Sequence, residues 1–257
     1  MTVIPHILAC DVGNSAVHFA HVHGEKVAPE QSTRIGELNG LGAALAELWR
    51  QMPQGKKLVA ASVNPPALKA LEAAAADALN EKVLVIGRDL PLPIQTNLPN
   101  PELIGVDRLC CAAAAYDRLG TACVVADFGT AITIDCVSDD GVFLGGAILP
   151  GLSMSAKGLH GGTAQLPLVE PAEPTGVFGT DTEQAILSGL VQGARGALRE
   201  LVEAYATELG HWPIVIVTGG NAGLICNHVG ESDLVQAVVD DLAIRGVAAA
   251  YYRTLVK

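Results

Sequence analysis

Two aspartates are each followed, two positions later, by a glycine that lies between two runs of strand-forming residues. One group is Asp11-Val-Gly-Asn-Ser15 (the Asp11 turn), and the other is Asp127-Phe-Gly-Thr130 (the Asp127 turn). Each pattern predicts a strand, a tight turn and a returning strand. Backbone N–H groups can converge on one point in such a turn, which suits a phosphate group. A carboxylate beside that phosphate would repel it unless a cation such as Mg²⁺ lies between them.

One such turn is common in hairpins, but two copies in one chain could hold a triphosphate from both sides. A further candidate for a nucleotide site is Val217-Thr-Gly-Gly-Asn-Ala222, which follows an apolar run. Its glycine pair, Gly219 and Gly220, would let the backbone approach a flat ring or a ribose. The two turns and this loop favour a nucleotide-binding protein.

An aspartate and an arginine stand side by side in Gly105-Val-Asp-Arg108, at the start of a predicted helix. The helix dipole favours the ionised form of Asp107 at that position. An ionised carboxylate can accept a hydroxyl proton and orient the oxygen as a nucleophile. The planar guanidinium of Arg108 suits a carboxylate or an amide carbonyl. Taken alone, the same residues are more typical of a helix cap with a salt bridge.

The elements that must position these residues alternate between strands and helices, as in α/β layers. A capping box, Thr180-x-x-Glu183, is predicted to start the longest helix, which ends near Gly210. The two aspartate turns stand almost half of the 257-residue chain apart, which indicates that one α/β domain is duplicated. Apolar spacing predicts further helices at 41–52, 66–79, 107–119 and about 243–256, strands at 59–63, 82–87 and 214–217, and an irregular connection over 87–105.

Charge and composition exclude several classes of protein. The chain has 27 Asp and Glu against 16 Lys and Arg, a net charge of −11, so we expect no nucleic-acid partner. No apolar run approaches the roughly 20 residues that cross a bilayer, so we expect a cytoplasmic protein without a membrane partner. The six cysteines form no C-x-x-C pair and are expected to be free buried thiols. His21 and His23 would share a strand face, but without a third ligand nearby we expect surface residues.

The order of six motifs resembles the type III pantothenate kinases, a family of the acetate and sugar kinase/Hsp70/actin superfamily. The resemblance extends from about residue 6 to the C-terminus. The motifs are DVGNS (11–15), GVDR (105–108), DFGTAIT (127–133), GGAILPG (145–151), TAQLP (163–167) and VTGGNA (217–222).

This resemblance implies an α/β fold of duplicated ribonuclease H-like (actin-like ATPase) domains, each with a mixed sheet flanked by helices. We expect an N-terminal domain at 1–113 and a C-terminal domain at 114–257. The implied reaction is transfer of the γ-phosphate of ATP to the primary hydroxyl of pantothenate, which yields 4′-phosphopantothenate in the first step of coenzyme A biosynthesis. The family also implies a homodimer, with residues 145–159 near the interface.

The resemblance assigns a role to each matching position. Asp107 is the proton acceptor. The pantothenate-binding residues are Gly105, Val106, Asp107, Arg108 and Thr182, and the ATP-binding residues are Asp11, Val12, Gly13, Asn14, Ser15, Thr130, Gly219 and Gly220. Asp11 lies near Mg²⁺, and Asp127 binds a monovalent cation, K⁺ or NH₄⁺. With these roles, ATP would bind between the halves, with its phosphates over both turns.

Four positions depart from the family pattern. Ser15 replaces the usual threonine and keeps the hydroxyl, whereas Val106 is bulkier than the common alanine and could shift the pantothenate pocket. Asn221 replaces an aspartate near the expected adenosine, and residues 100–104 lack a tyrosine that lines the substrate in many relatives. Two alternatives stay open: a kinase for another small alcohol, and a non-catalytic regulatory or accessory protein of the same fold.

Overall fold

The computed structural model describes residues 4–226 and 234–255, which form two compact units. The first unit contains the described residues up to Arg118 and those from Asp241 onward, and the second contains the described residues between Leu119 and Asp240. The division predicted from the sequence, 1–113 and 114–257, differs from this one mainly in the C-terminal segment. That segment returns to the first unit.

The sheet of the first unit has the strand order β3-β2-β1-β5-β6, with β4 also paired to β2. β1 is antiparallel to β2 and parallel to β5, so the Asp11 turn joins β1 to β2 at the end where β5 also finishes. The strands are β1 (His6–Val12), β2 (Ala16–His23), β3 (Lys26–Val27), β4 (Gln31–Arg34), β5 (Lys56–Ser62) and β6 (Leu84–Val85).

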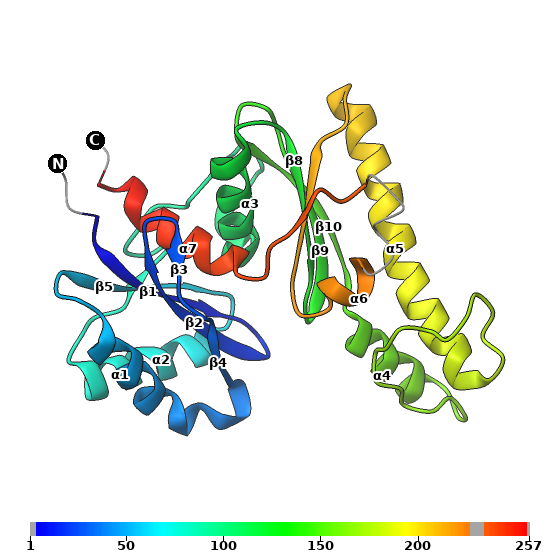
Figure 1. Cartoon of the computed structure of the whole chain (residues 1–257), viewed down its shortest axis with the longest axis horizontal. Coiled ribbons are helices and arrows are strands. Elements are labelled where there is room, and N and C mark those ends of the chain that lie inside the picture. The colour runs from blue at the N-terminus through cyan, green and yellow to red at the C-terminus, as the bar shows by residue number, and fades with distance from the viewer. Residues whose placement is uncertain (1–3, 227–233, 256–257) are drawn as a thin grey trace. The chain divides into compact units, whose positions relative to one another are not determined.

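Helices cover both faces of this sheet. Side chains of β1 alternate between the two faces, so this strand contributes to a core on each side. Leu8, Cys10 and Val12 pack into a core with α1 and α2, whereas Ile7 and Ala9 pack into a core with α3 and α7 (Figure 1). The helices of this unit are η1 (Ile35–Gly40), α1 (Leu41–Gln51), α2 (Pro65–Leu79), η2 (Pro101–Leu103), α3 (Val106–Leu119) and α7 (Leu242–Arg253). The connection over 87–105 holds η2 and a short strand, β7 (Gln95–Thr96).

The terminal helix α7 belongs to the first unit because its apolar face completes that unit's core. Ile244 and Val247 are buried against β1 and α3. Gly246 allows the close approach, since a Cβ at this position would lie 2.0 Å from the carbonyl oxygen of Cys110. The sequence predicted this helix but could not show which sheet it covers. Residue 256, the predicted end of the helix, lies outside the described residues.

The second unit repeats the arrangement of the first. β8 is antiparallel to β9 and parallel to β11, as β1 is to β2 and β5. Within this unit the strands lie in the order β12-β11-β8-β9-β10. They are β8 (Cys123–Phe128), β9 (Ala131–Val137), β10 (Val142–Pro150), β11 (Ile214–Thr218) and β12 (Ala237–Val238). The helices are α4 (Leu152–Gly162), α5 (Thr182–Leu209) and α6 (Ala222–Cys226).

The long helix α5 runs along the second sheet (Figure 1) and buries Val191, Leu198 and Val202 in its core. Its cap differs from the predicted one. Asp181, rather than Thr180, is the N-cap residue, because its Oδ1 accepts a hydrogen bond from the N–H of Gln184 at 2.8 Å. Thr182 is therefore the first residue of the helix.

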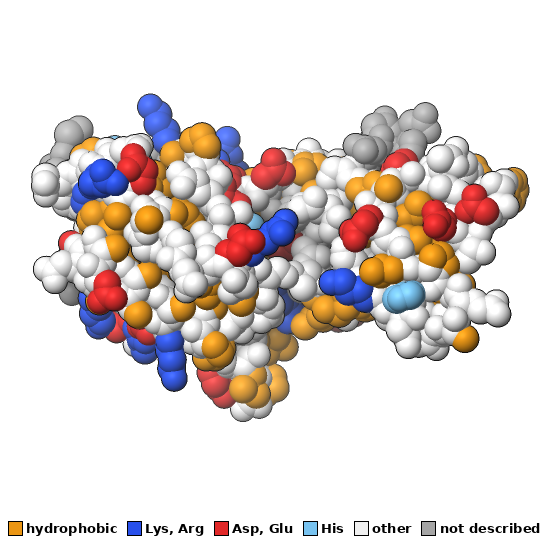
Figure 2. Space-filling view, turned by 90° about the horizontal axis from the view of Figure 1, so that it is seen from below, with side chains coloured by type: hydrophobic (Ala, Val, Ile, Leu, Met, Phe, Trp, Pro, Cys, Tyr) orange, Lys and Arg blue, Asp and Glu red, His pale blue; other side chains and the backbone are white. Residues whose placement is uncertain are grey.

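Charged side chains of both signs are interspersed over the face shown in Figure 2. In the described part of the chain, no helix combines the length and the apolar character needed to span a bilayer. All six cysteines are free thiols, and all except Cys226 are buried.

Three imidazoles lie together on one face of the β1–β2 hairpin. Nδ1 of His6 lies 2.9 Å from Nε2 of His21, and the ring of His6 stacks on that of His23 with centroids 4.1 Å apart. Burial lowers the pKa of His6 and of His21, and the neighbouring imidazoles lower both further. The sequence missed His6 as a neighbour of the other two, because only strand pairing brings it there. Within residues 4–226 and 234–255, no group of three or more His, Cys, Asp or Glu side chains is arranged to hold a metal ion.

We expect this cluster to make the fold sensitive to acid. A histidine whose pKa is lower in the folded than in the unfolded chain contributes stability above the unfolded pKa of about 6.5, and that stability is lost as the pH falls. His6→Gln should therefore reduce the drop in melting temperature between pH 7.5 and 5.5, measured by circular dichroism. His211→Gln is the control. Asp139 raises the pKa of His211, so this histidine stabilises the fold at low pH, and its replacement should increase the drop in melting temperature. Equal drops in the wild type and in His6→Gln would contradict this role.

Candidate active site

The Asp11 turn is a short hairpin connection at the end of β1. The N–H of Gly13 donates to the carbonyl oxygen of Ala16 at 3.0 Å, which closes the turn. Asn14 and Ser15 are exposed at its tip, whereas Val12 is fully buried. Asp11 is half-buried, and its Oδ1 is shielded from solvent. The turn therefore presents its exposed backbone beside a largely shielded carboxylate.

The segment that follows β5 holds the Asp11 turn in place. The N–H of Val63 donates to the carbonyl oxygen of Val12 at 3.1 Å. The side-chain amide of Asn64 donates to the carbonyl oxygen of Gly13 at 3.3 Å. The sequence analysis missed Asn64. Its signal was an asparagine directly before Pro65 and Pro66, a typical N-cap and N1 pattern.

Asp107 lies in the first turn of α3, as predicted. Its Oδ1 accepts a hydrogen bond from the N–H of Arg108 at 2.8 Å. The carboxylate also folds back over Gly105, where a Cβ would lie only 2.6 Å from Oδ1. A side chain in place of the glycine of GVDR would therefore require the Asp107 carboxylate to move.

Burial raises the pKa of the Asp107 carboxyl, and the Arg108 N–H and guanidinium offset only part of that rise. The expectation that the helix start would favour the ionised form was therefore incomplete. Loss of hydration outweighs the favourable interactions of the helix N-terminus, because the charged form is the one that burial disfavours. A carboxylate with a raised pKa is a stronger base than an exposed one.

The carboxylates of Asp11 and Asp107 both affect the pKa of Cys110 within the first unit. Burial raises the pKa of the Cys110 thiol, and the negative charges of Asp11 and Asp107 raise it further. Cys110 stands one helical turn after Asp107, so it shares the face of α3 that carries the carboxylate. The structure thus gathers DVGNS and GVDR, which are far apart in sequence, at one end of β1.

The Asp127 turn in the second unit is built like the Asp11 turn. The N–H of Gly129 donates to the carbonyl oxygen of Ala131 at 3.1 Å, and Thr130 is exposed at the tip. Gly151, the last residue of GGAILPG, donates to the carbonyl oxygen of Thr130 at 3.2 Å. A Cβ on Gly151 would lie 2.3 Å from that oxygen, so this glycine is required for the contact.

The VTGGNA loop closes over the carboxylate of Asp127. Thr218 pairs with Asp127 in the parallel ladder of β11 and β8. Gly219 follows with a φ of 93°, and a Cβ there would lie 2.2 Å from Oδ1 of Asp127. The described part of the second unit therefore brings three motifs, DFGT, GGAILPG and VTGGNA, to one place.

Asn221 has a structural role that the sequence did not reveal. Its backbone N–H and its side-chain Nδ2 both donate to the carbonyl oxygen of Phe128, at 3.0 and 3.3 Å. An aspartate at this position would lack that side-chain donor, and its charge would repel the carbonyl. The amide thus helps to attach the VTGGNA loop to the Asp127 turn.

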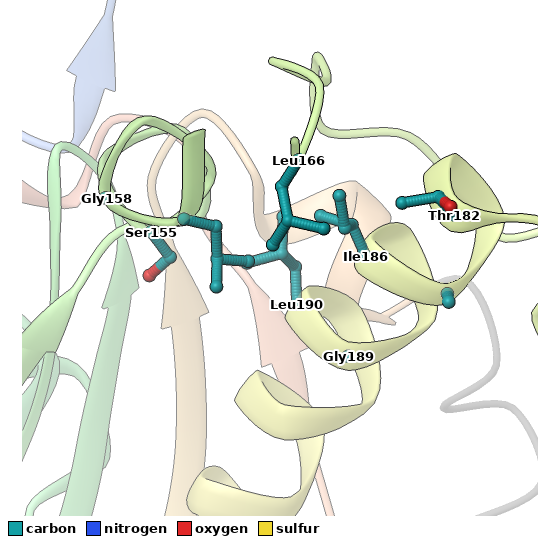
Figure 3. Close-up of a pocket in the computed structure, with 9 residues that line it drawn as sticks. Ser155, Gly158, Leu166, Thr182, Ile186, Gly189 and Leu190 are labelled. Carbon is teal, nitrogen blue, oxygen red and sulfur yellow. The ribbon is translucent and has the colours of Figure 1, made fainter. Parts of the chain in front are cut away.

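Thr182 lines a groove of about 640 Å³ in the second unit. In Figure 3 it lies at the start of α5, with Ile186 and Leu190 on the following turns of the same helix and Ser155 on α4. Leu159 and Leu166 complete a mostly apolar lining. The groove therefore joins a predicted substrate residue to the segment 145–159 predicted to lie near an interface.

The predicted site residues are distributed over both units. Asp11 to Ser15 and Gly105 to Arg108 lie in the first, whereas Asp127, Thr130, Thr182, Gly219 and Gly220 lie in the second. Val106 is buried in the core that α3 shares with α7, and its effect on the pantothenate pocket stays a prediction. The closing of both turns around one triphosphate stays a prediction.

The carboxylates fit the cations that the sequence analysis assigned to them. Oδ1 of Asp11 and Oδ1 of Asp127 are both buried at strand ends beside glycine turns. Oxygen ligands of this kind suit Mg²⁺ and K⁺, and Mg²⁺ commonly needs only one or two protein carboxylates when phosphate oxygens supply further ligands. The absence of a larger ligand cluster among the described residues is compatible with that mode of binding.

Known proteins resemble the chain over most of its length. A family model described as type III pantothenate kinase matches residues 7–204. The chain is 32% identical over 259 residues to a type III pantothenate kinase of Dehalococcoides mccartyi, and the match covers 95% of this chain and 96% of the relative. It is 30% identical over 254 residues to a type III pantothenate kinase of Geobacter sulfurreducens, covering 96% and 98% of the two chains.

Solved structures with low sequence identity share the fold. A Campylobacter jejuni protein described as a Baf family transcriptional activator aligns with a TM-score of 0.62 at 21% identity, covering 96% of this chain and 98% of the other. A Sinorhizobium meliloti protein described as a 2-dehydro-3-deoxygalactonokinase aligns with a TM-score of 0.56 at 15% identity, covering 97% and 99%. The fold is accordingly that of the sugar kinases and actin-like ATPases, with two mixed sheets flanked by helices, as predicted.

Proposed function

We infer that this chain, which belongs to the type III pantothenate kinase family, transfers the γ-phosphate of ATP to the primary hydroxyl of pantothenate. It is a phosphotransferase, and its product, 4′-phosphopantothenate, enters coenzyme A biosynthesis. The observation that carries this inference is the family match over residues 7–204, because that range contains the Asp11 turn, GVDR and the Asp127 turn.

We propose that Asp107 accepts the proton of the pantothenate hydroxyl and orients its oxygen toward the γ-phosphorus. Its raised pKa supports this role, since a stronger base takes a larger share of the proton in the transition state. Arg108 adds a planar pair of donors for the carboxylate or the amide carbonyl of pantothenate. Gly105 supports the arrangement by leaving room for the carboxylate.

We propose that the Asp11 turn binds ATP at its phosphates and that the glycine pair of VTGGNA lies against its adenosine. The residues assigned to ATP are Asp11, Val12, Gly13, Asn14, Ser15, Thr130, Gly219 and Gly220. Asp11 would hold Mg²⁺, and Asp127 would hold K⁺ or NH₄⁺. These cations would offset the negative charge of the phosphate oxygens, as phosphoryl transfer requires. They would supply positive charge that a chain of net charge −11 otherwise lacks.

Thr182 is proposed as a further contact for pantothenate. Its hydroxyl is exposed at the start of α5, beside a groove whose lining is mostly apolar. Pantothenate combines hydroxyl and amide groups with two methyl groups, so a hydroxyl beside an apolar surface suits it.

We propose that the protein is cytoplasmic and that two copies of the chain form a homodimer. Leu144, Ile148, Met154 and Leu159, in and beside the segment 145–159, expose large apolar side chains. Ile148 is 64% exposed. Burial of such side chains against a second chain would remove apolar surface from water.

A coupled kinase assay tests the proposed function. Formation of 4′-phosphopantothenate from ATP, Mg²⁺ and pantothenate, with activation by K⁺, is the expected result. Pantetheine, glycerol and simple sugars serve as competing acceptors. Preferred turnover of one of these would identify a kinase for another alcohol. Absence of turnover with every acceptor would favour a regulatory or accessory protein.

Replacement of Gly105 by alanine should lower kcat at least 10-fold. A Cβ at 2.6 Å from Oδ1 of Asp107 forces the carboxylate to move, and small displacements of a catalytic group are costly. The assay is steady-state kinetics with both substrates. Gly36→Ala is the control, because no atom lies within 4 Å of a Cβ there. A kcat for Gly105→Ala equal to that of the control would show that the carboxylate position is not critical.

A further inference from the structure

Asn64 connects the Asp11 turn to the start of α2. Its Oδ1 accepts a hydrogen bond from the N–H of Ala67 at 3.1 Å, which caps the helix. Its Nδ2 donates to the carbonyl oxygen of Gly13 at 3.3 Å. The two ends of one amide therefore make two different contacts, one structural for α2 and one directed at the turn.

The conformation of Asn64 is itself fixed by its neighbours. Ser62 Oγ accepts from the N–H of Asn64 at 3.1 Å and donates to its carbonyl oxygen at 3.2 Å. Pro65, at the first position of α2, restricts the backbone of the preceding residue to extended conformations, and Asn64 has φ −132° and ψ 90°. The side chain is half-buried, so its amide is held toward Gly13 by a rigid support.

The tip of the turn is exposed, and the N–H of Ile35 donates to the carbonyl oxygen of Ser15 at 3.0 Å. Asn14 and Ser15 are open to solvent, and Gly13 has no side chain with which to pack. The hydrogen bond from Val63 to Val12 continues the ladder of β1 and β5 up to the buried side of the turn. The Asn64 amide extends this support by one residue, to the peptide that links Gly13 to Asn14.

We propose that Asn64 is a positioning residue that fixes the Asp11 turn in the conformation that binds the phosphates of ATP. This inference rests on the proposed function, in which residues 11–15 bind ATP. A peptide whose carbonyl oxygen is hydrogen-bonded keeps its plane, and its N–H, on the next residue, then keeps one direction. Preorganised N–H groups bind phosphate more tightly than mobile ones, because the ordering cost is already met in the free protein.

Two substitutions separate the two contacts. Asn64→Ser and Asn64→Asp both retain a good N-cap acceptor for Ala67, but neither carries the amide donor that reaches Gly13. Asn64→Ser should raise the KM for ATP and weaken ATP binding by about 5-fold, the value of one neutral hydrogen bond. Asn64→Asp should have a larger effect, because its carboxylate also repels the Gly13 carbonyl. The melting temperature and the KM for pantothenate should stay near those of the wild type.

The matched control lies at the other end of the same helix. Asn80 is the C-cap of α2 and has a φ of 53°, a conformation that alanine tolerates poorly. Asn80→Ala should lower the melting temperature and leave the KM for ATP unchanged. A rise of the KM for ATP in Asn80→Ala equal to that in Asn64→Ser would show that α2 stability alone is responsible, and would overturn the inference.

ATP binding by calorimetry and turnover of pantothenate are measured separately. If the wild type phosphorylates pantothenate and the Asn64 variants bind ATP as the wild type does, the inference fails while the proposed function stands. If the wild type binds ATP but phosphorylates no pantothenate, the proposed function fails, and the affinity ratio between the variants and the wild type still decides the role of Asn64.

Discussion

Asp107→Asn is expected to reduce kcat by about 100-fold or more while ATP binding stays near that of the wild type. The asparagine keeps the size of the side chain and an oxygen that can accept the hydrogen bond from the N–H of Arg108. It removes the group that accepts the hydroxyl proton. Steady-state kinetics and calorimetric titration with ATP give the two quantities. Near-normal turnover would exclude Asp107 as the base.

The pH profile provides a second test of Asp107. Only the ionised carboxylate can accept a proton, so kcat/KM of the wild type should fall as the pH decreases through the pKa of Asp107. Burial raises that pKa, so the fall should begin at a higher pH than for an ordinary aspartate, whose pKa is about 3.9. This limb of the profile should be absent from the residual activity of Asp107→Asn.

Stability measurements on Asp107→Asn test whether unfolding is the cause of lost turnover. A carboxyl group whose pKa is raised on folding favours the folded state below its unfolded pKa, and this contribution is lost as the pH rises through the folded pKa. At neutral pH the buried charge is therefore a cost, which asparagine removes. Asp107→Asn should melt at or above the temperature of the wild type.

A control variant on the same helix completes this test. Asp117 lies ten residues later on α3, where it pairs with Arg253 at the surface. Asp117→Asn should keep normal turnover.

Asp127→Ala is expected to abolish activation by K⁺. In the wild type, turnover with K⁺ should exceed turnover without it, whereas the ratio should fall to about one in the variant, because the proposed cation ligand is gone. The kinase assay is run over a range of K⁺ concentrations at constant ionic strength, with NH₄⁺ and Na⁺ as comparisons. Unchanged K⁺ activation in Asp127→Ala would rule out its role as the ligand.

The surroundings of Asp127 allow an independent version of this test. Gly219→Ala keeps the carboxylate but places a Cβ 2.2 Å from its Oδ1, so the carboxylate or the loop must move. The K⁺ response should be weakened in this variant as well. Asp140→Asn, at the exposed turn between β9 and β10, removes one negative charge from the same unit and should leave the K⁺ response intact.

Much of the fold could be predicted because its determinants are local in the chain. The strand–turn–strand pattern around Asp11 and Asp127 depends on neighbouring residues, and both turns form as predicted. The helices at 41–51, 65–79 and 106–119 follow from apolar spacing within single segments. The order of six short motifs sufficed for the family, because each is a contiguous run of residues.

What the sequence alone determined was therefore the alternation of elements, the two aspartate turns and the family. Tertiary structure decided which sheet α7 covers, how deeply Asp107 is buried, and which loops Asn64 and Asn221 join. The physical reason is that burial and hydrogen bonding depend on residues far apart in the chain. Asn221 and Phe128 meet only because β11 pairs with β8, and Asn64 reaches Gly13 only because β5 lies beside β1.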